Sequence, residues 1–445
     1  MTGAHLDGAG LPLAWAAPFA GLLLSIALGP QLAPRFWHRR FELVAAGWAL
    51  ALMLPLAVVF GPSLAGALLL ETALHEYLPF IVLLFALFTI AGGVRVRGRL
   101  CGTPLTNTAM LGAGALLASV AGTTGAAMLL VRPVIHANLK RPRNAHVLVF
   151  FIFLVANIGG ALTPVGDPPL FLGFLHGVPF LWTTRHMLAP FAVCAGLVLG
   201  VFYLVDRWFE RCEPPGEPPP RERFAVDGAH NLLLLALAVG SVLASGVWRP
   251  GLELRMLGVA LPVQDVARDA VLLGLAVLSW VTTPRKVRIE NAFTWEPMAE
   301  VVWLFAAIFT TIIPVLAMLR AGEDGALAPV SALVGGAEGH PAAYFWTTGL
   351  LSSVLDNAPT YLVFFNMAGG DPARLTGELA HVLVAVSSGA VFMGALTYVG
   401  NAPNFMVRAI AKERGVRMPG FFGYIGWSAV VLLPVFALLT LVFFR

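Results

Sequence analysis

The sequence predicts an all-α membrane protein with about ten transmembrane helices, two re-entrant hairpins, and inverted repeats with two discontinuous helices. Its composition is the first indication: 58% of the residues are apolar, 12% are charged, and the mean hydropathy is +0.82. Soluble domains carry about 25% charged residues, so a chain this long and apolar is expected to be dissolved in lipid. The spacing of the apolar stretches and a repeated decapeptide are the second and third indications.

Apolar stretches that approach the length of a membrane-crossing helix, about 20 residues, predict eight uninterrupted spans. They lie near residues 12–30, 42–61, 78–94, 186–205, 230–247, 269–283, 298–319 and 420–444. Two further spans, near 147–175 and 380–408, are interrupted in the middle. Two more stretches, near 105–131 and 341–366, are broken by small and polar residues. Each of these two is predicted to enter and leave on one side as a hairpin.

The basic residues support this topology. With the N-terminus outside, about three in four of the 28 Lys and Arg fall on the inner side, as the positive-inside rule requires. The inner groups include Arg132, Lys140, Arg141 and Arg143, and later Arg408, Lys412, Arg414 and Arg417. If either hairpin were a single crossing, every later loop would invert and the bias would degrade. We therefore expect both termini outside a bacterial-type inner membrane, and the net charge of +4 needs no nucleic-acid partner.

An internal repeat divides the chain. Residues 160–169 read GALTPVGDPP and residues 394–403 read GALTYVGNAP, identical at seven of ten positions with an offset of 234. The same offset aligns residues 117–120 with 351–354. Five crossings precede the second unit, and an odd number makes it run opposite to the first. Inverted repeats with discontinuous helices are typical of secondary transporters, whose sites lie at the repeat interface near the midplane.

The repeat predicts four regions. Residues 1–74 form N-terminal scaffold helices, and residues 75–212 form the first inverted repeat with its hairpin and broken helix. Residues 213–297 hold a linker, proline-rich at 213–220, and connecting helices. Residues 298–445 form the second inverted repeat.

Four segments carry the polar chemistry: the hairpin tips at 119–125 and 352–360, and the helix breaks at 157–168 and 397–404. Non-helical backbone at membrane depth persists only when it is buried in protein or lines a wet cavity. Its free carbonyls, with hydroxyl, amide and carboxylate side chains, suit a hard cation, whereas half-helix N-termini at the same breaks suit an anion. The candidate ion or substrate ligands are Asp356, Asn357, Asp167, Thr360, Ser353, Asn157, Thr163, Thr123, Thr124, Thr397, Asn401 and Asn404.

Asp167 and Asp356 are the two carboxylates in these segments and the expected proton-coupling residues, with Asp356 ranked first. A charge at the bilayer centre costs about 2.5–3.5 kcal/mol or more, which makes such residues functional candidates. Helix capping is the alternative role for both carboxylates. Asp167 directly precedes Pro168, as an N-cap residue would, and the neutral Asn401 stands at the equivalent position of the second repeat. Two carboxylates in one cavity repel each other, which favours uptake of a proton by one of them. Protons and sodium would then compete for the same oxygens, at a site formed by Asp356, Asn357 and Asp167.

Residues 162–180 (LTPVGDPPLFLGFLHGVPF) and 352–366 (SSVLDNAPTYLVFFN) resemble the ion-transporter superfamily. That group includes NhaD-type sodium/proton antiporters, arsenite permeases and dicarboxylate or citrate carriers. The resemblance runs from about residue 75 to the end, and favours the branch labelled sodium/proton antiporter or citrate transporter. It implies a homodimer in which a scaffold part carries a transport part with both hairpins.

The superfamily's Ser-Asn-Thr signatures map in part, with Ser353, Asn357 and Thr360 near the second tip. The first tip has Ser119 and two threonines but no Asn. Asp167 stands where relatives often carry a small polar residue, and a second acid would repel an anionic substrate.

The sequence therefore predicts a secondary transporter that exchanges sodium or lithium for protons, with no cofactor. The alternative is a cation-coupled citrate or dicarboxylate carrier, in which the acids hold the coupling ions. An arsenite efflux permease ranks third, since Cys101, Cys194 and Cys212 lie outside the four segments. An enzyme is not expected, because no metal-ligand spacing or nucleophile motif occurs.

Overall fold

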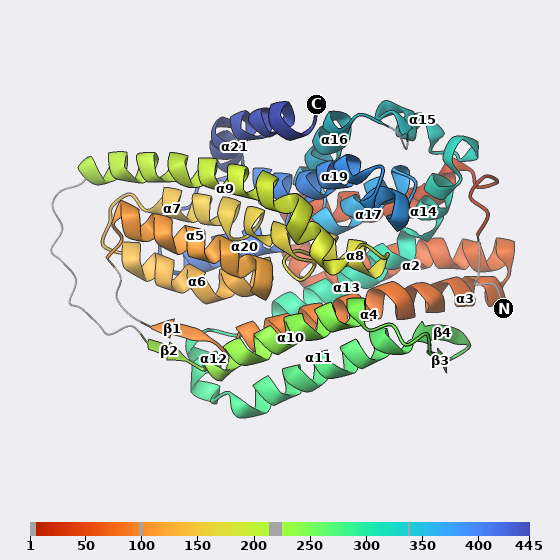
Figure 1. Cartoon of the computed structure of the whole chain (residues 1–445), viewed down its shortest axis with the longest axis horizontal. Coiled ribbons are helices and arrows are strands. Elements are labelled where there is room, and N and C mark those ends of the chain that lie inside the picture. The colour runs from red at the N-terminus through yellow and green to blue at the C-terminus, as the bar shows by residue number, and fades with distance from the viewer. Residues whose placement is uncertain (1–5, 98–100, 213–224, 337–338) are drawn as a thin grey trace.

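The computed structural model describes residues 6–97, 101–212, 225–336 and 339–445. Helices dominate these residues, which include 21 α-helices and only four short strands (Figure 1). The strands form two antiparallel pairs, β1 (Arg95–Arg97) with β2 (Ala225–Asp227) and β3 (Glu253–Met256) with β4 (Val259–Pro262). The prediction of an all-α membrane protein is confirmed. The predicted proline-rich linker at 213–220 lies outside the described residues.

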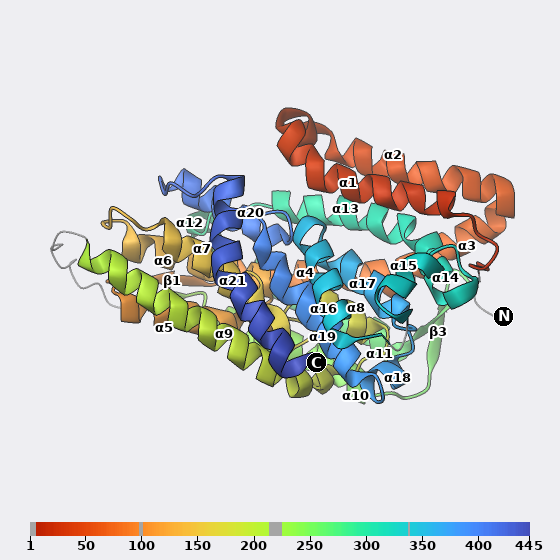
Figure 2. The same cartoon turned by 90° about the horizontal axis from the view of Figure 1, so that it is seen from above.

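The N-terminal part is a series of long helices joined by tight connections. Gly61, with φ of +89°, lets the chain turn between the second and third helices, and each of these two helices begins with a proline in its first turn. The elements are η1 (Leu13–Ala16), α1 (Ala17–Leu32), α2 (Pro34–Phe60), α3 (Pro62–Thr72), the π-helix η2 (Ala73–Tyr77) and α4 (Leu78–Ala91). Figure 2 shows α1 and α2 side by side along one flank of the molecule.

The first predicted hairpin is present. Thr103 caps its first arm, and Gly122, with φ of +77°, turns the chain between the two arms. The arms are antiparallel, because Gly102 N donates to Ala137 O (3.0 Å) and so joins the start of one to the end of the other. The hairpin and the broken helix after it comprise α5 (Pro104–Ala121), α6 (Thr123–Asn138), α7 (Ala145–Leu154), η3 (Ile158–Leu162), α8 (Pro168–Leu175) and α9 (Phe180–Arg211).

The connecting region packs on α4, which contacts both of its long helices. It comprises α10 (His230–Val247), α11 (Val263–Thr282) and α12 (Arg285–Glu290). The second repeat then opens with a helix bent by 41°, formed by α13 (Glu296–Thr311) and α14 (Ile313–Arg320). The short elements η4 (Gly322–Asp324) and α15 (Ala328–Leu333) follow it.

The second hairpin mirrors the first. The ring of Tyr344, near the start of one arm, lies 6.3 Å from the ring of Phe364, near the end of the other, so the arms are antiparallel. The hairpin, the second broken helix and the final span comprise α16 (Pro341–Val354), α17 (Asn357–Met367), α18 (Pro372–Thr376), α19 (Ala380–Met393), η6 (Gly394–Leu396), α20 (Ala402–Glu413) and α21 (Phe421–Phe443).

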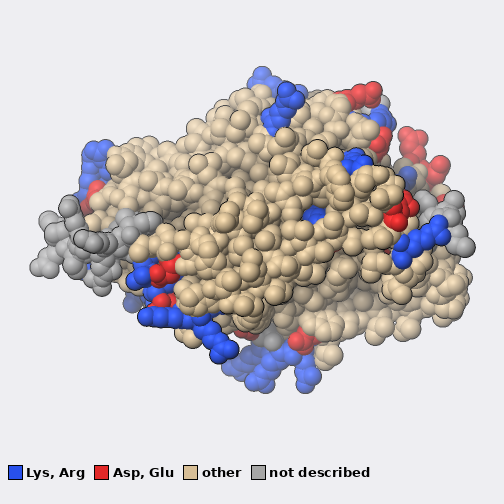
Figure 3. All heavy atoms as spheres, turned by 60° about the horizontal axis from the view of Figure 1, so that its bottom comes forward, with Lys and Arg blue, Asp and Glu red and all other residues tan. Residues whose placement is uncertain are grey.

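Eight described helical segments are long and apolar enough to cross a membrane, and the bent α13–α14 pair is a ninth candidate. They include α5, which pairs with α6 as a hairpin arm. The span predicted at 269–283 corresponds to α11, but that helix begins at Val263 and so also takes in Asp265 and Arg268. Figure 3 shows a broad band with almost no Lys, Arg, Asp or Glu across much of the visible face, apart from a small blue patch near its middle, with most charged residues gathered toward the ends and edges.

The two repeats are related by contacts as well as by sequence. The offset of 234 takes the start of α6 to the start of α17, and the start of α8 to the start of α20. Correspondingly, α6 packs on α20 and α17 packs on α8. The two pairs extend from the middle of the molecule toward opposite ends (Figures 1 and 2). Equivalent helices therefore run in opposite directions, as inverted repeats require.

One part of the charge assignment is wrong. Arg132 was expected in an inner loop because the apolar stretch ends at residue 131 and Pro133 follows. Instead α6 continues through Pro133 to Asn138, so Arg132 lies inside a helix. Arg408 and Lys412 likewise belong to α20. A proline removes one helical hydrogen bond but does not always end a helix in a membrane protein, where neighbouring groups can compensate.

Candidate functional site

Four half-helices begin at one place in the middle of the molecule. They are α6, α8, α17 and α20, and the residues just before them are Gly122, Asp167, Asp356 and Asn401. The first N–H groups of a helix have no partner within the helix, and they carry partial positive charge. Four such ends create a polar, electropositive centre, and hydrogen bonds join the side chains that surround it.

Asp167 lies at this centre and contacts the other three segments. Its Oδ1 accepts hydrogen bonds from Thr123 Oγ1 (3.0 Å) in the first tip and Asn401 Nδ2 (3.4 Å) in the second break. Its Oδ2 accepts from Asn357 Nδ2 (2.6 Å) in the second tip. The residue is 1% exposed, and its side chain makes no capping bond to α8. The geometry therefore does not fit helix capping as the role of this carboxylate.

The charge of Asp167 has no basic partner among the described residues, where the side chains that contact it are Thr123, Asn357 and Asn401. Asn357 is completely buried, and its Oδ1 has no hydrogen-bond partner within the described part of the chain. A buried carboxylate and an unpartnered amide oxygen are both costly unless a proton or a cation joins them. This pair is thus the oxygen-rich spot that a small cation or a proton would occupy.

Asp356 plays a different part. Its Oδ1 accepts from Ala358 N (3.1 Å), so the side chain caps α17, and the residue is half-buried. Its backbone oxygen accepts from Thr360 Oγ1 (2.9 Å), which gives that threonine a local role within the helix. The geometry therefore favours Asp167 over Asp356 as the principal ion-binding residue, the reverse of the order expected from the sequence.

Amide side chains hold the two helix breaks against each other. Asn157 Nδ2 donates to Asn404 Oδ1 (2.8 Å), and Asn401 Nδ2 donates to Ala156 O (3.0 Å). Asn404 Nδ2 in turn donates to Gly394 O (2.9 Å) and to Thr397 O, within its own break. These side chains replace the backbone hydrogen bonds that the broken helices lack, so their role here is structural support of the site.

The hydroxyl groups follow the repeat. Thr163 Oγ1 donates to Ser119 O, and Thr397 Oγ1 donates to Ser353 O (2.6 Å), two bonds related by the offset of 234. Each of them ties a helix break to the neighbouring hairpin tip. Thr124 makes no side-chain hydrogen bond among the described residues and is half-buried. It is therefore the one predicted threonine whose hydroxyl remains free for a ligand.

Glycines let the chain cross itself at both breaks. A Cβ on Gly166 would collide with Gly160 O, and a Cβ on Gly400 would lie 2.6 Å from Gly394 O. These two pairs are again related by the offset of 234. Because the colliding atoms are backbone atoms, no side-chain movement relieves the clash. The close approach explains why the decapeptide repeat keeps glycine at these positions.

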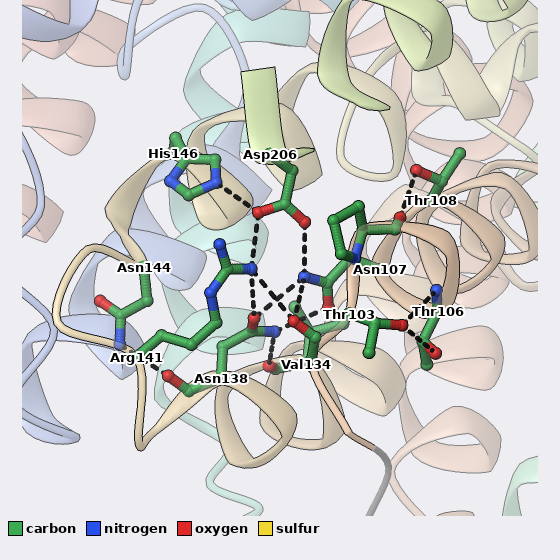
Figure 4. A network of polar contacts seen from close by, with 12 residues as sticks. Thr103, Thr106, Asn107, Thr108, Val134, Asn138, Arg141, Asn144, His146 and Asp206 are labelled. Carbon is green, nitrogen blue, oxygen red and sulfur yellow. Dashed lines mark hydrogen bonds and ion pairs between the residues drawn. The ribbon is translucent and has the colours of Figure 1, made fainter. Parts of the chain in front are cut away.

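A second buried acid escaped the sequence reasoning. Asp206 of α9 is fully buried and accepts from Asn107 Nδ2 of α5 (2.8 Å) and from Arg141 Nη1 (2.6 Å), and it lies 2.8 Å from His146 Nε2 of α7 (Figure 4). Asn138 of α6 donates to Asn107 Oδ1 in the same network. The network anchors the base of the first hairpin. The sequence signal is an acid directly after the apolar stretch 186–205, at a position where a charge normally begins a loop.

A cavity of about 490 Å³ lies apart from this site, between the N-terminal segment, α3, η2 and the α13–α14 bend. Its walls include Glu71, His75, Glu76 and Arg320, and none of the four tip and break segments lines it. Glu76 Oε1 lies 3.7 Å from Nε2 of His176, the residue that follows α8. His75 and Glu76 thus lie at this cavity.

Comparison with known proteins adds a family and one relative. A family described as "putative citrate transport" matches residues 8–444. An uncharacterized transporter, slr0753, of Synechocystis sp. (strain ATCC 27184 / PCC 6803 / Kazusa) is 26% identical over 294 residues. That match covers 60% of this chain, and the chain spans about three fifths (61%) of the relative's length.

Proposed function

Because the chain belongs to the citrate transport family over residues 8–444, we propose that it is a secondary active transporter that exchanges sodium or lithium for protons across an inner membrane. The observation that carries this proposal is the environment of Asp167. One carboxylate joins both hairpin tips and the second break, with no basic partner among the described residues. A small cation and a proton are the ligands that neutralise such a group most directly.

Asn357 gives the site two states. With Asp167 ionised, Asn357 Nδ2 donates to the carboxylate, as in this structure. When Asp167 takes up a proton, its O–H becomes a donor, and a flipped Asn357 amide presents Oδ1 to accept it. A sodium ion instead draws Oδ1 and the carboxylate together as ligands. Sodium and the proton therefore exclude each other at the same oxygens, which is the requirement for exchange.

Alternating access follows from the inverted pairs. The pair α6–α20 leads from the site toward one face and α17–α8 leads toward the other. Movement of one repeat against the other opens the site to each face in turn. Asp167 exchanges its proton for sodium on one side and sodium for a proton on the other, so neither ion crosses alone.

The test is purified protein in proteoliposomes with an imposed pH gradient and an internal pH dye. Added sodium or lithium is expected to dissipate the gradient, and potassium is expected to have less effect. Asp167→Asn should lower the initial rate by more than about tenfold, which corresponds to about 1.4 kcal/mol. Asp371→Asn is the matched control, because Asp371 caps the short helix α18 away from the site. Wild-type exchange in Asp167→Asn would refute the proposal.

A second function, cation-coupled transport of citrate or a dicarboxylate, is favoured by one feature of the site. Four helix N-termini converge there, and such ends bind anions. The family's description points the same way. Uptake of labelled citrate or succinate into the same vesicles, driven by sodium or by protons, would establish this function. Uptake without any sodium-induced proton flux would make it the primary one.

A further inference from the structure

The hairpin of β3 and β4, which joins α10 to α11, projects at one end of the molecule (Figure 1). Every residue from 251 to 258 is exposed. Four of them are large and apolar, namely Leu252, Leu254, Met256 and Leu257, with exposed fractions of 44–79%. Leu257 also has φ of +53°, a strained backbone conformation for a residue with a large side chain. This segment therefore contributes little to the core of its own chain.

The two edges of this hairpin differ. Val263 N donates to Leu252 O (3.0 Å), and hydrogen-bonded pairs alternate along an antiparallel ladder. Glu253 and Arg255 therefore direct their backbone N–H and C=O groups away from β4, at an edge that pairs with no described strand. The far edge of β4 contains Pro262, which has no N–H, and packs against η2. An open strand edge like that of β3 is a ready template for another strand.

The side chains of β3 are sorted by chemistry. Successive residues of a strand point to opposite faces. Leu252, Leu254 and Met256 therefore lie on one face of the hairpin. Glu253 and Arg255 lie on the other face, and neither forms an ion pair with a described residue. A strand with an acid and a base two residues apart complements itself when it pairs with a second copy in the antiparallel direction.

Only one register uses this pattern. The outward backbone groups of Glu253 and Arg255 meet those of a second copy when a two-fold axis lies at residue 253, 254 or 255. An axis at 253 sets two glutamates opposite each other, and an axis at 255 sets two arginines, both of which are unfavourable. An axis at Leu254 instead places Glu253 opposite the partner's Arg255. It also sets Leu252 against the partner's Met256, so both faces of the strand match.

We propose that a second copy of this chain docks on β3, antiparallel and with the two-fold axis at Leu254, to form a continuous four-stranded sheet. The family resemblance implies a homodimer but does not say where the copies meet. Figure 2 shows β3 running across the long axis of the molecule, along which α4, α10 and α11 extend in Figure 1. A strand in that direction lies parallel to the membrane plane when those helices span the membrane. Two copies inserted in the same orientation require this of a strand pair.

The first test uses disulfide cross-linking in proteoliposomes, in a background where the native cysteines Cys101, Cys194 and Cys212 are replaced. Leu254→Cys should form a disulfide-linked dimer on oxidation, because residues directly opposite in an antiparallel pair lie within disulfide reach. Leu252→Cys alone and Met256→Cys alone should form little dimer, because each lies about 14 Å from its own copy in this register. A mixture of these two variants should form the linked dimer.

The second test reverses the charges. Energy transfer between differently labelled copies, followed as the protein is diluted in lipid, gives the dissociation constant of the dimer. Glu253→Arg alone and Arg255→Glu alone should each raise this constant by more than about fivefold, because like charges then stand opposite each other. Mixing the two single variants should restore association, since each acid again faces a base. Glu323→Arg, which reverses an exposed acid outside the hairpin, is the control and should dimerise like wild type.

Three results would overturn the proposal. The first is wild type that stays monomeric in the bilayer, which would leave the apolar face of the hairpin to lipid. The second is a disulfide yield at Leu254→Cys no higher than at Leu252→Cys, which would mean random collision or another register. The third is unchanged association in Glu253→Arg, or no recovery in the mixture with Arg255→Glu, which would place the dimer contact on another surface. None of these readouts depends on sodium-induced proton flux, so the exchange function is tested separately.

Discussion

Asp167 and Asp356 have similar sequence settings and different structural roles. Asp167 binds side chains from three other segments and does not cap its helix, whereas Asp356 caps α17 through Ala358 N. The contrast arises because a residue before a half-helix can turn its side chain toward its own helix or toward the centre. Sequence alone does not specify that choice, which depends on the donors that the other repeat supplies.

The cap assignment predicts a mild effect for Asp356→Asn. Asparagine caps helices about as well as aspartate, so the thermal unfolding temperature should stay close to wild type. Exchange should slow by less than it does in Asp167→Asn, because the proton-binding carboxylate remains. The pair of rates, measured side by side in proteoliposomes, checks this order. A complete loss of exchange in Asp356→Asn with a normal Asp167→Asn would reverse the assignment.

Residue types in the tips and breaks could be predicted because the bilayer makes polar groups conspicuous in an apolar sequence. All four segments do meet, and Asn157, Asn357, Asn401, Asn404 and Asp167 lie within one hydrogen-bonded network. Asp206 was missed because it lies at the end of an apolar stretch, where a charge normally marks the start of a loop. Only packing against other helices shows that it is buried.

At the scale of elements, the first hairpin depends on Asp206. Its carboxylate contacts Asn107, Arg141 and His146, which come from the two ends of the hairpin and from α7 (Figure 4). Asp206→Ala would leave buried polar groups without their partner, a loss of about 3–5 kcal/mol. Thermal unfolding in detergent should show a clear fall in Tm. Glu378→Ala, which breaks an exposed pair with Arg374, is the control and should change little.

An unchanged Tm in Asp206→Ala would mean that the hairpin is held by its apolar contacts alone. The measurement should include Asp206→Asn, which keeps the shape of the side chain and can still accept from Asn107. We expect an intermediate fall for that variant, because the charge-assisted bonds to Arg141 and His146 are the stronger ones.

The two helix breaks depend on glycine. Gly166→Ala and Gly400→Ala place a methyl group against the backbone of Gly160 and Gly394. Each should lower both the yield of folded protein and the exchange rate, because the methyl group prevents the close backbone contact within the helix break. Gly196→Ala in α9, where nothing lies within 4 Å of the new methyl group, is the control and should be neutral or slightly stabilising. Normal folding and exchange in Gly166→Ala would show that the first helix break does not need the close backbone contact between Gly166 and Gly160.

At the scale of the whole molecule, the hairpins at 105–131 and 341–366 could be predicted because the distribution of arginine and lysine favoured them over single crossings. The offset of 234 then related the two hairpins as equivalent parts of a repeat. Helix lengths were less predictable. The helix around 269–283 begins earlier and takes in Asp265 and Arg268, where Arg268 is buried and bonds both Asp265 and Asp269, so paired charges there do not end the helix.

The inverted arrangement also explains why one carboxylate can serve both faces. Equivalent helix pairs leave the site in opposite directions, and Asp167 is held by residues of both repeats. In the proposed exchange, a relative movement of the two repeats would change the partners of Asp167 and open it to each face in turn.

The most direct measurement is proton release on sodium binding by purified protein in weakly buffered detergent solution. If sodium and the proton compete for the carboxylate of Asp167, wild type should release protons when sodium is added, and more of them at a pH where the site is largely protonated. Asp167→Asn should release none, while Asp371→Asn releases as many as wild type. Equal proton release from Asp167→Asn and wild type, or sodium binding by wild type without any release, would contradict competition at Asp167.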